Sequence, residues 1–329
     1  MVERRPGVIP PKPGRPPSRP SQRQVTRRRI VALTVLVIVL GGLGWAAVTA
    51  IGGGTSKHTA PTTSASSLIY RTETITTNGR TTETVIAMPK PFHIVFPEGF
   101  TITQMANRIT AVDAIATRER RVKPRLSARG YRAAVSHTDG PTCFHGRRRS
   151  MEGFLFPATY EFFMKTTNRD LVRQQLAAFC ANWQHVDLAY ARSKNLTPYD
   201  VLIIASMVEK ETLSPDERPL VAAVIYNRLH KRMPLGIDAT LRYGLDIPPT
   251  QSITESELNS DSPYNTRKRL GLPPTPVANP GLASMQAAAH PAEVNYVYFV
   301  RKPDKKHHFF TASFQAFQHY EATHGYGTH

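Results

Sequence analysis

The 329-residue chain is poor in several residue types, and each shortage excludes a class of protein. It has two cysteines, Cys143 and Cys180, which are too few for a disulfide-dense scaffold or a zinc site built from several cysteines. They can form at most one disulfide. Acidic residues are also scarce, 24 against 42 Lys and Arg, so the formal net charge is +18. Hydrophobic residues still make up 40% of the chain, which excludes wholesale disorder.

Part of the positive charge is concentrated at the N-terminus. Residues 1–29 contain nine Lys and Arg, seven prolines and a single acidic residue, without apolar periodicity. This composition predicts a solvated, polyproline-like tail. The basic residues favour a topology signal and attraction to anionic lipid. No motif supports a nucleic-acid partner.

Residues 30–51 form the longest uncharged apolar stretch, 22 residues. As a helix this stretch would rise about 33 Å, enough to cross a hydrocarbon layer of about 30 Å. We therefore predict a single-pass membrane helix. Three arginines (Arg27, Arg28, Arg29) precede it, and the positive-inside bias predicts a cytoplasmic N-terminus with the remainder extracytoplasmic. A cleaved signal peptide, with a weak cleavage site at 48–50, is the alternative.

The sequence after the predicted membrane helix divides into a linker and a small module. Residues 52–90 are rich in Gly, Ser and Thr and predict an extracytoplasmic linker with a reach of roughly 35 Å as random coil, although 67–88 could form one or two strands. A strand at 92–96, a turn and a short helix at 103–109 predict a small α/β module over 91–149.

Two basic segments of this module, 118–132 and 147–149, are predicted to be solvated loops, with binding of an anionic polymer as the alternative.

A buried helix with charged residues at its end is the most informative local pattern. Thr197, Pro198 and Asp200 form a helix start before the apolar run 201–208. Such a run predicts burial nearly all round, yet it ends in Glu-Lys-Glu (209–211). Because the C-terminal end of a helix disfavours negative charge, carboxylates there must be solvated, paired with a cation or part of a functional site. Two residues apart, the glutamates cannot both face one cleft.

A second helix follows closely. Residues 214–217, Ser-Pro-Asp-Glu, predict a capping box before an apolar stripe that ends at Leu229. Asn227 and Arg228 fall off this stripe. Only three residues separate Glu211 from Pro215, so Glu211 is predicted at a tight corner between helices, a common place for a cleft wall.

Several segments, in order, resemble the YceG-like (MltG) endolytic transglycosylases, membrane-anchored bacterial enzymes that cut peptidoglycan strands. The segments are MEGFLFPATY (151–160), ASMVEKET (205–212), YNRL (226–229), PLGIDAT (234–240), SPYNT (262–266), GLPP (271–274) with ANPG (278–281), AHP (289–291), YFV (298–300) and HHF (307–309). Four positions depart from the family pattern: Ala158 for Asp, Gly236 for Gln, Arg267 for Tyr and Thr275 for Gly. The departures at Ala158 and Gly236 bear on fine subsite preference, not on the chemistry.

The resemblance implies an α+β fold, with a single-pass anchor, a small LysM-like α/β module at 91–149 and a mixed helix/strand lytic-transglycosylase catalytic domain at 150–329. It implies cleavage of the β-1,4 bond between N-acetylmuramic acid and N-acetylglucosamine in nascent peptidoglycan strands, leaving 1,6-anhydro ends. Glu211 is the expected catalytic residue, with Glu209 and Asn227 in supporting roles. The expected substrate-binding residues are Glu152, Asp238, Tyr264, Asn265 and Asn279. Turn capping is an equally physical role for the Asn and Asp residues.

One carboxyl group suits this reaction. A glycosidic oxygen leaves poorly until it is protonated, so an acid with a raised pKa is needed. The muramic acid C6 hydroxyl then acts as the nucleophile, a role that the second carboxylate or an activated water has in ordinary glycosidases. No cofactor is expected, and no metal, because the spacing of His290, His307 and His308 lacks a metal-ligand pattern such as HExxH.

Two other functions compete with this interpretation. The first is a non-catalytic, membrane-tethered protein that binds glycan and holds cell-wall synthases. Such a protein would keep the glycan-binding groove but would not need the catalytic acid at Glu211. A metal-dependent amidase or peptidase is the other alternative, but the sequence lacks a set of metal ligands for it. If the enzyme is tethered close to the synthases, it would act as a terminator of glycan polymerisation, with peptidoglycan strands, the membrane and the synthases as partners.

Overall fold

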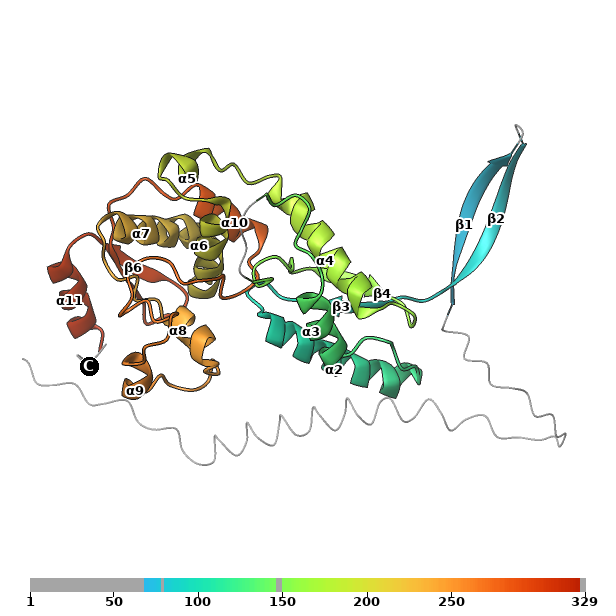
Figure 1. The fold of residues 1–329 in the computed structure, drawn as a ribbon, viewed down its shortest axis with the longest axis horizontal. Coiled ribbons are helices and arrows are strands. Elements are labelled where there is room, and N and C mark those ends of the chain that lie inside the picture. Colours follow the sequence, from blue (N-terminus) through green and yellow to red (C-terminus); the bar gives the residue numbers. More distant parts are fainter. Residues whose placement is uncertain (1–67, 78–79, 146–149, 326–329) are drawn as a thin grey trace, which may run out of the picture. The chain divides into compact units, whose positions relative to one another are not determined.

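The computed structural model describes residues 68–77, 80–145 and 150–325 (Figure 1). The predicted tail and membrane helix lie outside these residues. Of the helices that the structure does describe, none has both the length and the apolar composition required to cross a membrane. The described chain is mostly helical, with three two-stranded antiparallel sheets. This is the mixed helix/strand class that the sequence predicts.

The C-terminal half of the predicted linker forms a hairpin. Strand β1 (Leu68–Thr77) pairs antiparallel with β2 (Arg80–Pro89), from Leu68 opposite Pro89 to Thr77 opposite Arg80. The prediction of one or two strands at 67–88 is therefore confirmed.

The predicted small module contains two helices and one strand of a two-stranded sheet. Strand β3 (Phe92–Val95) is followed by α2 (Ile102–Arg120) and α3 (Ala128–Ser136), and it pairs with β4 (Thr159–Phe162). Strand β4 lies beyond the predicted boundary at 149/150, so the sheet of this module extends to Phe162. Its LysM-like character stays a prediction.

Helix α2 is longer than the predicted 103–109. A capping box of Thr101 and Gln104 starts it, and its buried side chains recur along one face as far as Ala116. The predicted loop at 118–132 is accordingly wrong in part, because it contains the last turn of α2 and the start of α3. The many polar residues on the exposed face hid the helical period in the sequence.

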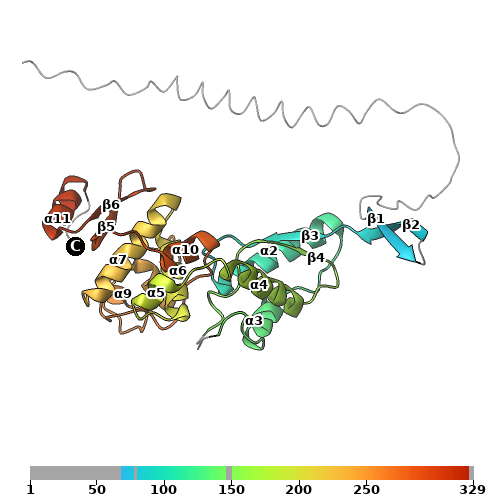
Figure 2. The same ribbon diagram turned by 90° about the horizontal axis from the view of Figure 1, so that it is seen from above.

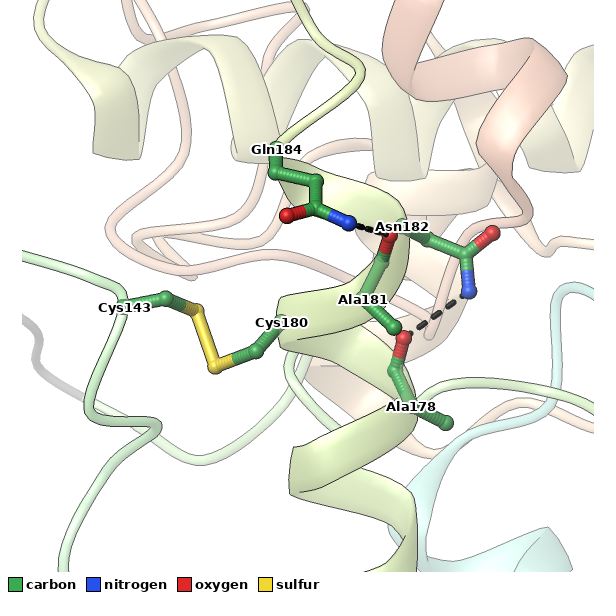
Figure 3. Close-up of a disulfide and its surroundings, with 6 residues drawn as sticks. All are labelled: Cys143, Ala178, Cys180, Ala181, Asn182 and Gln184. Carbon is green, nitrogen blue, oxygen red and sulfur yellow. Dashed lines mark hydrogen bonds between the residues drawn. A yellow bond between two sulfur atoms is a disulfide. The ribbon is translucent and has the colours of Figure 1, made fainter.

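A disulfide joins Cys143, in the loop after α3, to Cys180 in α4 (Asn168–Trp183) (Figure 3). The sequence left this pairing open. Helix α4 contacts α3 and β4, so the disulfide ties the loop to the helix that covers the module.

We expect Cys180→Ser to lower the free energy of unfolding by about 2 to 4 kcal/mol, because the disulfide closes a long loop in the unfolded chain. The cysteines are 37 residues apart. Chemical denaturation under oxidising and reducing conditions measures the effect. The double variant with Cys143→Ser should match the single one, and unequal losses would contradict the expectation.

The C-terminal part of the described chain is organised around α6 (Pro198–Glu211). Helices α7 (Arg218–His230), α8 (Asp238–Leu245) and α10 (Leu282–Ala289) pack on it (Figures 1 and 2). The predicted helix start is confirmed, with a capping box of Thr197 and Asp200, and every side chain from 201 to 208 is buried. The remaining elements are α5 (Ala189–Ser193), α9 (Glu255–Leu258), β5 (Tyr298–Arg301), β6 (His308–Thr311) and α11 (Phe314–Thr323).

The corner between α6 and α7 differs from the prediction. Residues Pro215–Glu217 form a 3-10 turn, and Ser214 makes no side-chain capping hydrogen bond. The predicted capping box is wrong because Glu217 binds elsewhere. Its carboxylate accepts hydrogen bonds from the backbone N–H of His308 (2.8 Å) and from His308 Nδ1 (2.7 Å), and both residues are buried.

Candidate active site

A cavity of about 1440 Å³ receives four of the predicted site residues. The start of α2, the end of α6, helix α8 and strand β5 contribute to its wall. Glu152, Glu211, Asp238 and Tyr264 line it. The other predicted residues are not among the lining residues.

Glu211 is the last residue of α6 and is partly buried in the cavity wall. Burial is the main cause that raises its pKa to about 7, and the negative charge of Asp238 adds to the rise. Arg301, a hydrogen bond from the backbone N–H of Ala239 and Lys210 act in the opposite direction. A carboxyl group with this pKa can both donate and accept a proton near neutrality.

This raised pKa predicts a pH-dependent stability. The folded chain binds the Glu211 proton more tightly than the unfolded chain, so an ionised Glu211 opposes folding, and stability is lost as pH rises from 4.5 toward about 7. Between pH 4.5 and 8, Glu211→Gln should gain stability relative to the original chain by up to about 3 kcal/mol. Chemical denaturation across this range tests it, with Gln at the exposed Glu293 as control. A pH-independent difference would contradict it.

Glu152 is nearly fully buried, with 2% exposure, and its oxygens are occupied by protein donors. It accepts hydrogen bonds from the backbone N–H of Ile102 (3.1 and 3.2 Å), from Asn279 Nδ2 (2.6 Å) and from the Tyr243 hydroxyl (3.3 Å). Burial raises its pKa to about 7 against these hydrogen bonds. Since Ile102 begins α2, Glu152 links the N-terminus of that helix to Tyr243 in α8 and to Asn279.

Two residues that depart from the family pattern contact predicted substrate-binding residues. Arg267 donates to Asp238 Oδ1 from Nε (3.1 Å) and from Nη2 (2.6 Å), and both side chains are about half exposed. The hydroxyl of Thr275 lies 2.7 Å from that of Tyr264. Both predicted residues therefore line the cavity with a side-chain partner at a position where the sequence departs from the expected family pattern.

Asn265 and Asn279 are fully buried and bind within the protein. Asn265 donates to the carbonyls of Leu258 (2.9 Å) and Ser260 (2.8 Å), so it holds a turn. Asn279 accepts from two backbone N–H groups, at Gly153 and Leu155, and donates to Glu152 and to the carbonyl of Phe100. Neither side chain is placed in the cavity wall.

Glu209 and Asn227, the predicted supporting residues, also bind protein groups. Glu209 accepts from the backbone N–H of Gly281 (3.0 Å), lies 3.9 Å from Arg218 and has a side-chain exposure of 6%. Glu209 is outside the cavity lining while Glu211 is part of it, as their two-residue spacing predicts. Asn227 donates to two carbonyls of the loop before β5, at 2.8 Å each.

Positive side chains of the cavity were not selected from the sequence. The cavity wall includes Lys210, Arg228, Arg242 and Arg301. Lys210 Nζ donates to the carbonyl of Gly99 (3.3 Å), and Arg228 donates to the carbonyls of Val297 and Leu235 (2.6 Å each). Arg228 follows Asn227 in a segment shared with the family, which is the one signal that could have found it.

Comparison with known proteins identifies the family of this chain. The YceG-like family model matches residues 62–323. The chain therefore belongs to the YceG-like family.

Relatives in this family are enzymes. The endolytic murein transglycosylase of Streptococcus pneumoniae (strain R6) is 33% identical over 229 residues, 63% of this chain and 40% of the relative. That of Bacillus subtilis is 34% identical over 155 residues, 47% of this chain and 43% of the relative. The chain thus spans less than half the length of these relatives.

A crystal structure of a YceG-like protein from Listeria monocytogenes matches the fold. The TM-score is 0.54 at 29% identity, and the match covers 69% of this chain and 75% of that one.

Proposed function

We propose that this chain is a membrane-anchored endolytic peptidoglycan transglycosylase in which Glu211 is the catalytic acid and base. One observation carries the proposal: a carboxyl group with a pKa of about 7 lies at the end of a buried helix, in the wall of a large cavity. The names of the relatives support the substrate class.

The reaction needs only this carboxyl group. Protonated Glu211 donates its proton to the glycosidic oxygen between N-acetylmuramic acid and N-acetylglucosamine, and the bond from that oxygen to C1 breaks. Ionised Glu211 then takes the proton of the muramic acid C6 hydroxyl, and the C6 oxygen of the sugar bonds to C1. No water is consumed, and the acid form of Glu211 is restored. The backbone N–H of Ala239 and the charges of Arg301 and Lys210 stabilise the ionised form between these steps.

The surroundings of Glu152 argue against a role for it as a second catalytic carboxylate. A two-carboxylate glycosidase needs a free nucleophile or base opposite its acid. Glu152 is the other cavity glutamate with a raised pKa among the described residues, and it already accepts hydrogen bonds from Ile102, Asn279 and Tyr243.

Mass spectrometry of glycan strands incubated with the full chain in detergent tests the chemistry. We expect new 1,6-anhydro ends at internal positions of the strands. Ends heavier by one water would indicate hydrolysis and overturn the mechanism. Binding without cleavage would favour the scaffold alternative.

We further propose that residues 30–51 anchor the protein, with the N-terminus in the cytoplasm and residues from 52 onward outside. The Cys143–Cys180 disulfide supports this placement, because disulfides persist in oxidising compartments. A reporter at the N-terminus should be active only in the cytoplasm, and one after His329 only outside. A mature chain that lacks residues 1–50 would show a cleaved signal instead.

Tethering near the synthases would make the enzyme a terminator of glycan polymerisation. Replacement of residues 1–51 by a cleavable export signal should leave cleavage of isolated glycan unchanged but lengthen newly made strands in cells, because the local enzyme concentration falls. Normal strand lengths at native expression would contradict the terminator role.

A further inference from the structure

A basic surface of the small module has no role in the proposed active site. It comprises six exposed side chains, which we call the basic end: Arg118, Arg120, Arg121, Lys123, Arg125 and Lys165. The acidic side chain within 118–125 is Glu119, which pairs with Arg118 at 3.2 Å. The basic end does not overlap the residues that line the large cavity.

Tertiary contacts bring the two halves of the basic end together. The backbone N–H of Arg125 donates to the carbonyl of Met164 (3.2 Å), and Asn168 Nδ2 donates to the carbonyl of Arg125 (3.5 Å). The segment after α2 therefore adjoins the loop between β4 and α4, which carries Lys165. The elements involved, α2, β4 and α4, lie together in both views (Figures 1 and 2).

The basic end also contacts the point where the chain enters the module. Arg120 Nη1 donates to the carbonyls of Lys90 (3.4 Å) and Pro91 (3.2 Å), and its guanidinium lies 4.3 Å from the ring centre of Phe92. Residues 90–92 are where the polypeptide arrives from the hairpin and, further upstream, from the predicted membrane helix. The basic end therefore lies next to the segment that connects the module to the predicted membrane helix.

Exposed apolar side chains distinguish between the two kinds of anionic partner. Phe163 is 36% exposed and Met164 is 49% exposed, and both directly precede Lys165. A polymer of phosphates and polyols offers no apolar phase for these side chains. A bilayer offers anionic headgroups for the cations and an interface for the aromatic ring and the thioether.

We propose that the basic end docks on anionic phospholipid headgroups of the membrane from which the chain emerges, with Phe163 and Met164 at the interface. The docking fixes the orientation of the folded part against the membrane, beyond what the covalent connection to the anchor can do. The proposal rests on the proposed membrane anchor and not on the transglycosylase chemistry.

Hydrogen exchange of the full chain in nanodiscs tests the docking. Discs of phosphatidylcholine alone are compared with discs that contain phosphatidylcholine and phosphatidylglycerol in equal amounts. We expect the amides of 118–126 and 163–166 to exchange more slowly in the phosphatidylglycerol discs. Each basic residue near an anionic membrane raises affinity roughly fivefold. In the double variant Lys123→Glu/Lys165→Glu, the slowing of exchange in phosphatidylglycerol discs should therefore be at least about tenfold smaller.

A matched variant separates a specific surface from general charge attraction. Lys231→Glu/Lys305→Glu reverses two exposed lysines elsewhere and changes the net charge equally. It should keep the protection, and an equal loss would overturn the proposal. Unchanged exchange of the buried amides of α6 shows that each variant is folded; if the double variant is not, the two single variants should each lose part of the protection.

Two further outcomes also count against docking on lipid. Equal exchange in both kinds of disc would overturn it. Soluble poly(glycerol phosphate) added to phosphatidylcholine discs is the second test. If it slows exchange more than phosphatidylglycerol discs do, the surface binds a wall polymer and docking on lipid is overturned. Failure of the full chain to insert into discs would instead refute the anchor on which the proposal rests.

Discussion

Turnover of glycan strands should fall by about 10² to 10⁴ when Glu211 is replaced by Gln, the usual contribution of general acid-base catalysis. Gln keeps the size of the side chain and a hydrogen-bond acceptor for the N–H of Ala239. It cannot donate a carboxyl proton to the glycosidic oxygen. The rate of formation of 1,6-anhydro ends, measured by mass spectrometry at saturating glycan, gives the effect on turnover.

Glu209→Gln is the matched control on the same helix. Glu209 binds the N–H of Gly281 and lies near Arg218, outside the cavity. Its replacement should leave turnover within about tenfold, well short of the loss of a catalytic acid. If Glu211→Gln keeps full activity while Glu209→Gln loses it, the catalytic role belongs to Glu209.

The largest loss of stability is expected for Asn279→Ala. The Asn279 side chain makes hydrogen bonds to two backbone N–H groups (Gly153, Leu155), the carbonyl of Phe100 and Glu152, all within the interior. Alanine leaves these groups buried without the partner. We expect the free energy of unfolding to fall by about 3 to 5 kcal/mol, measured by chemical denaturation.

Asn295→Ala provides the comparison, because Asn295 is exposed in the loop before β5. Its replacement should change the free energy of unfolding by no more than about 0.5 kcal/mol. A loss of less than about 1 kcal/mol for Asn279→Ala would show that the buried groups find other partners, since one unsatisfied buried group alone costs about that much.

Local sequence patterns predicted the elements that depend on near neighbours. Helix α6 begins at Pro198 because Thr197 and Asp200 cap it, and its apolar run is buried as expected. The two-residue spacing of Glu209 and Glu211 predicted their separate surroundings. The strand that begins at Phe92 was also predicted, because alternation within a strand is visible along the sequence.

The partners of buried polar groups depended on the tertiary structure. Glu217 lies in a sequence that predicts a capping box, yet it binds His308, 91 residues away. Asn279 lies in a loop typical of a groove, yet it joins Gly153 to Phe100 from the interior.

The sequence by itself determined the course of α6, the position of Glu211 at its end and the resemblance to the YceG-like family. Tertiary structure decided which carboxyl groups face the cavity, which asparagines are buried, where the sheet of the small module ends and which cations gather at the basic end. The physical reason is range. Capping and periodicity act within a turn or two of the chain, whereas a buried hydrogen-bonding group takes whichever donor or acceptor the packing of distant segments brings within about 3 Å.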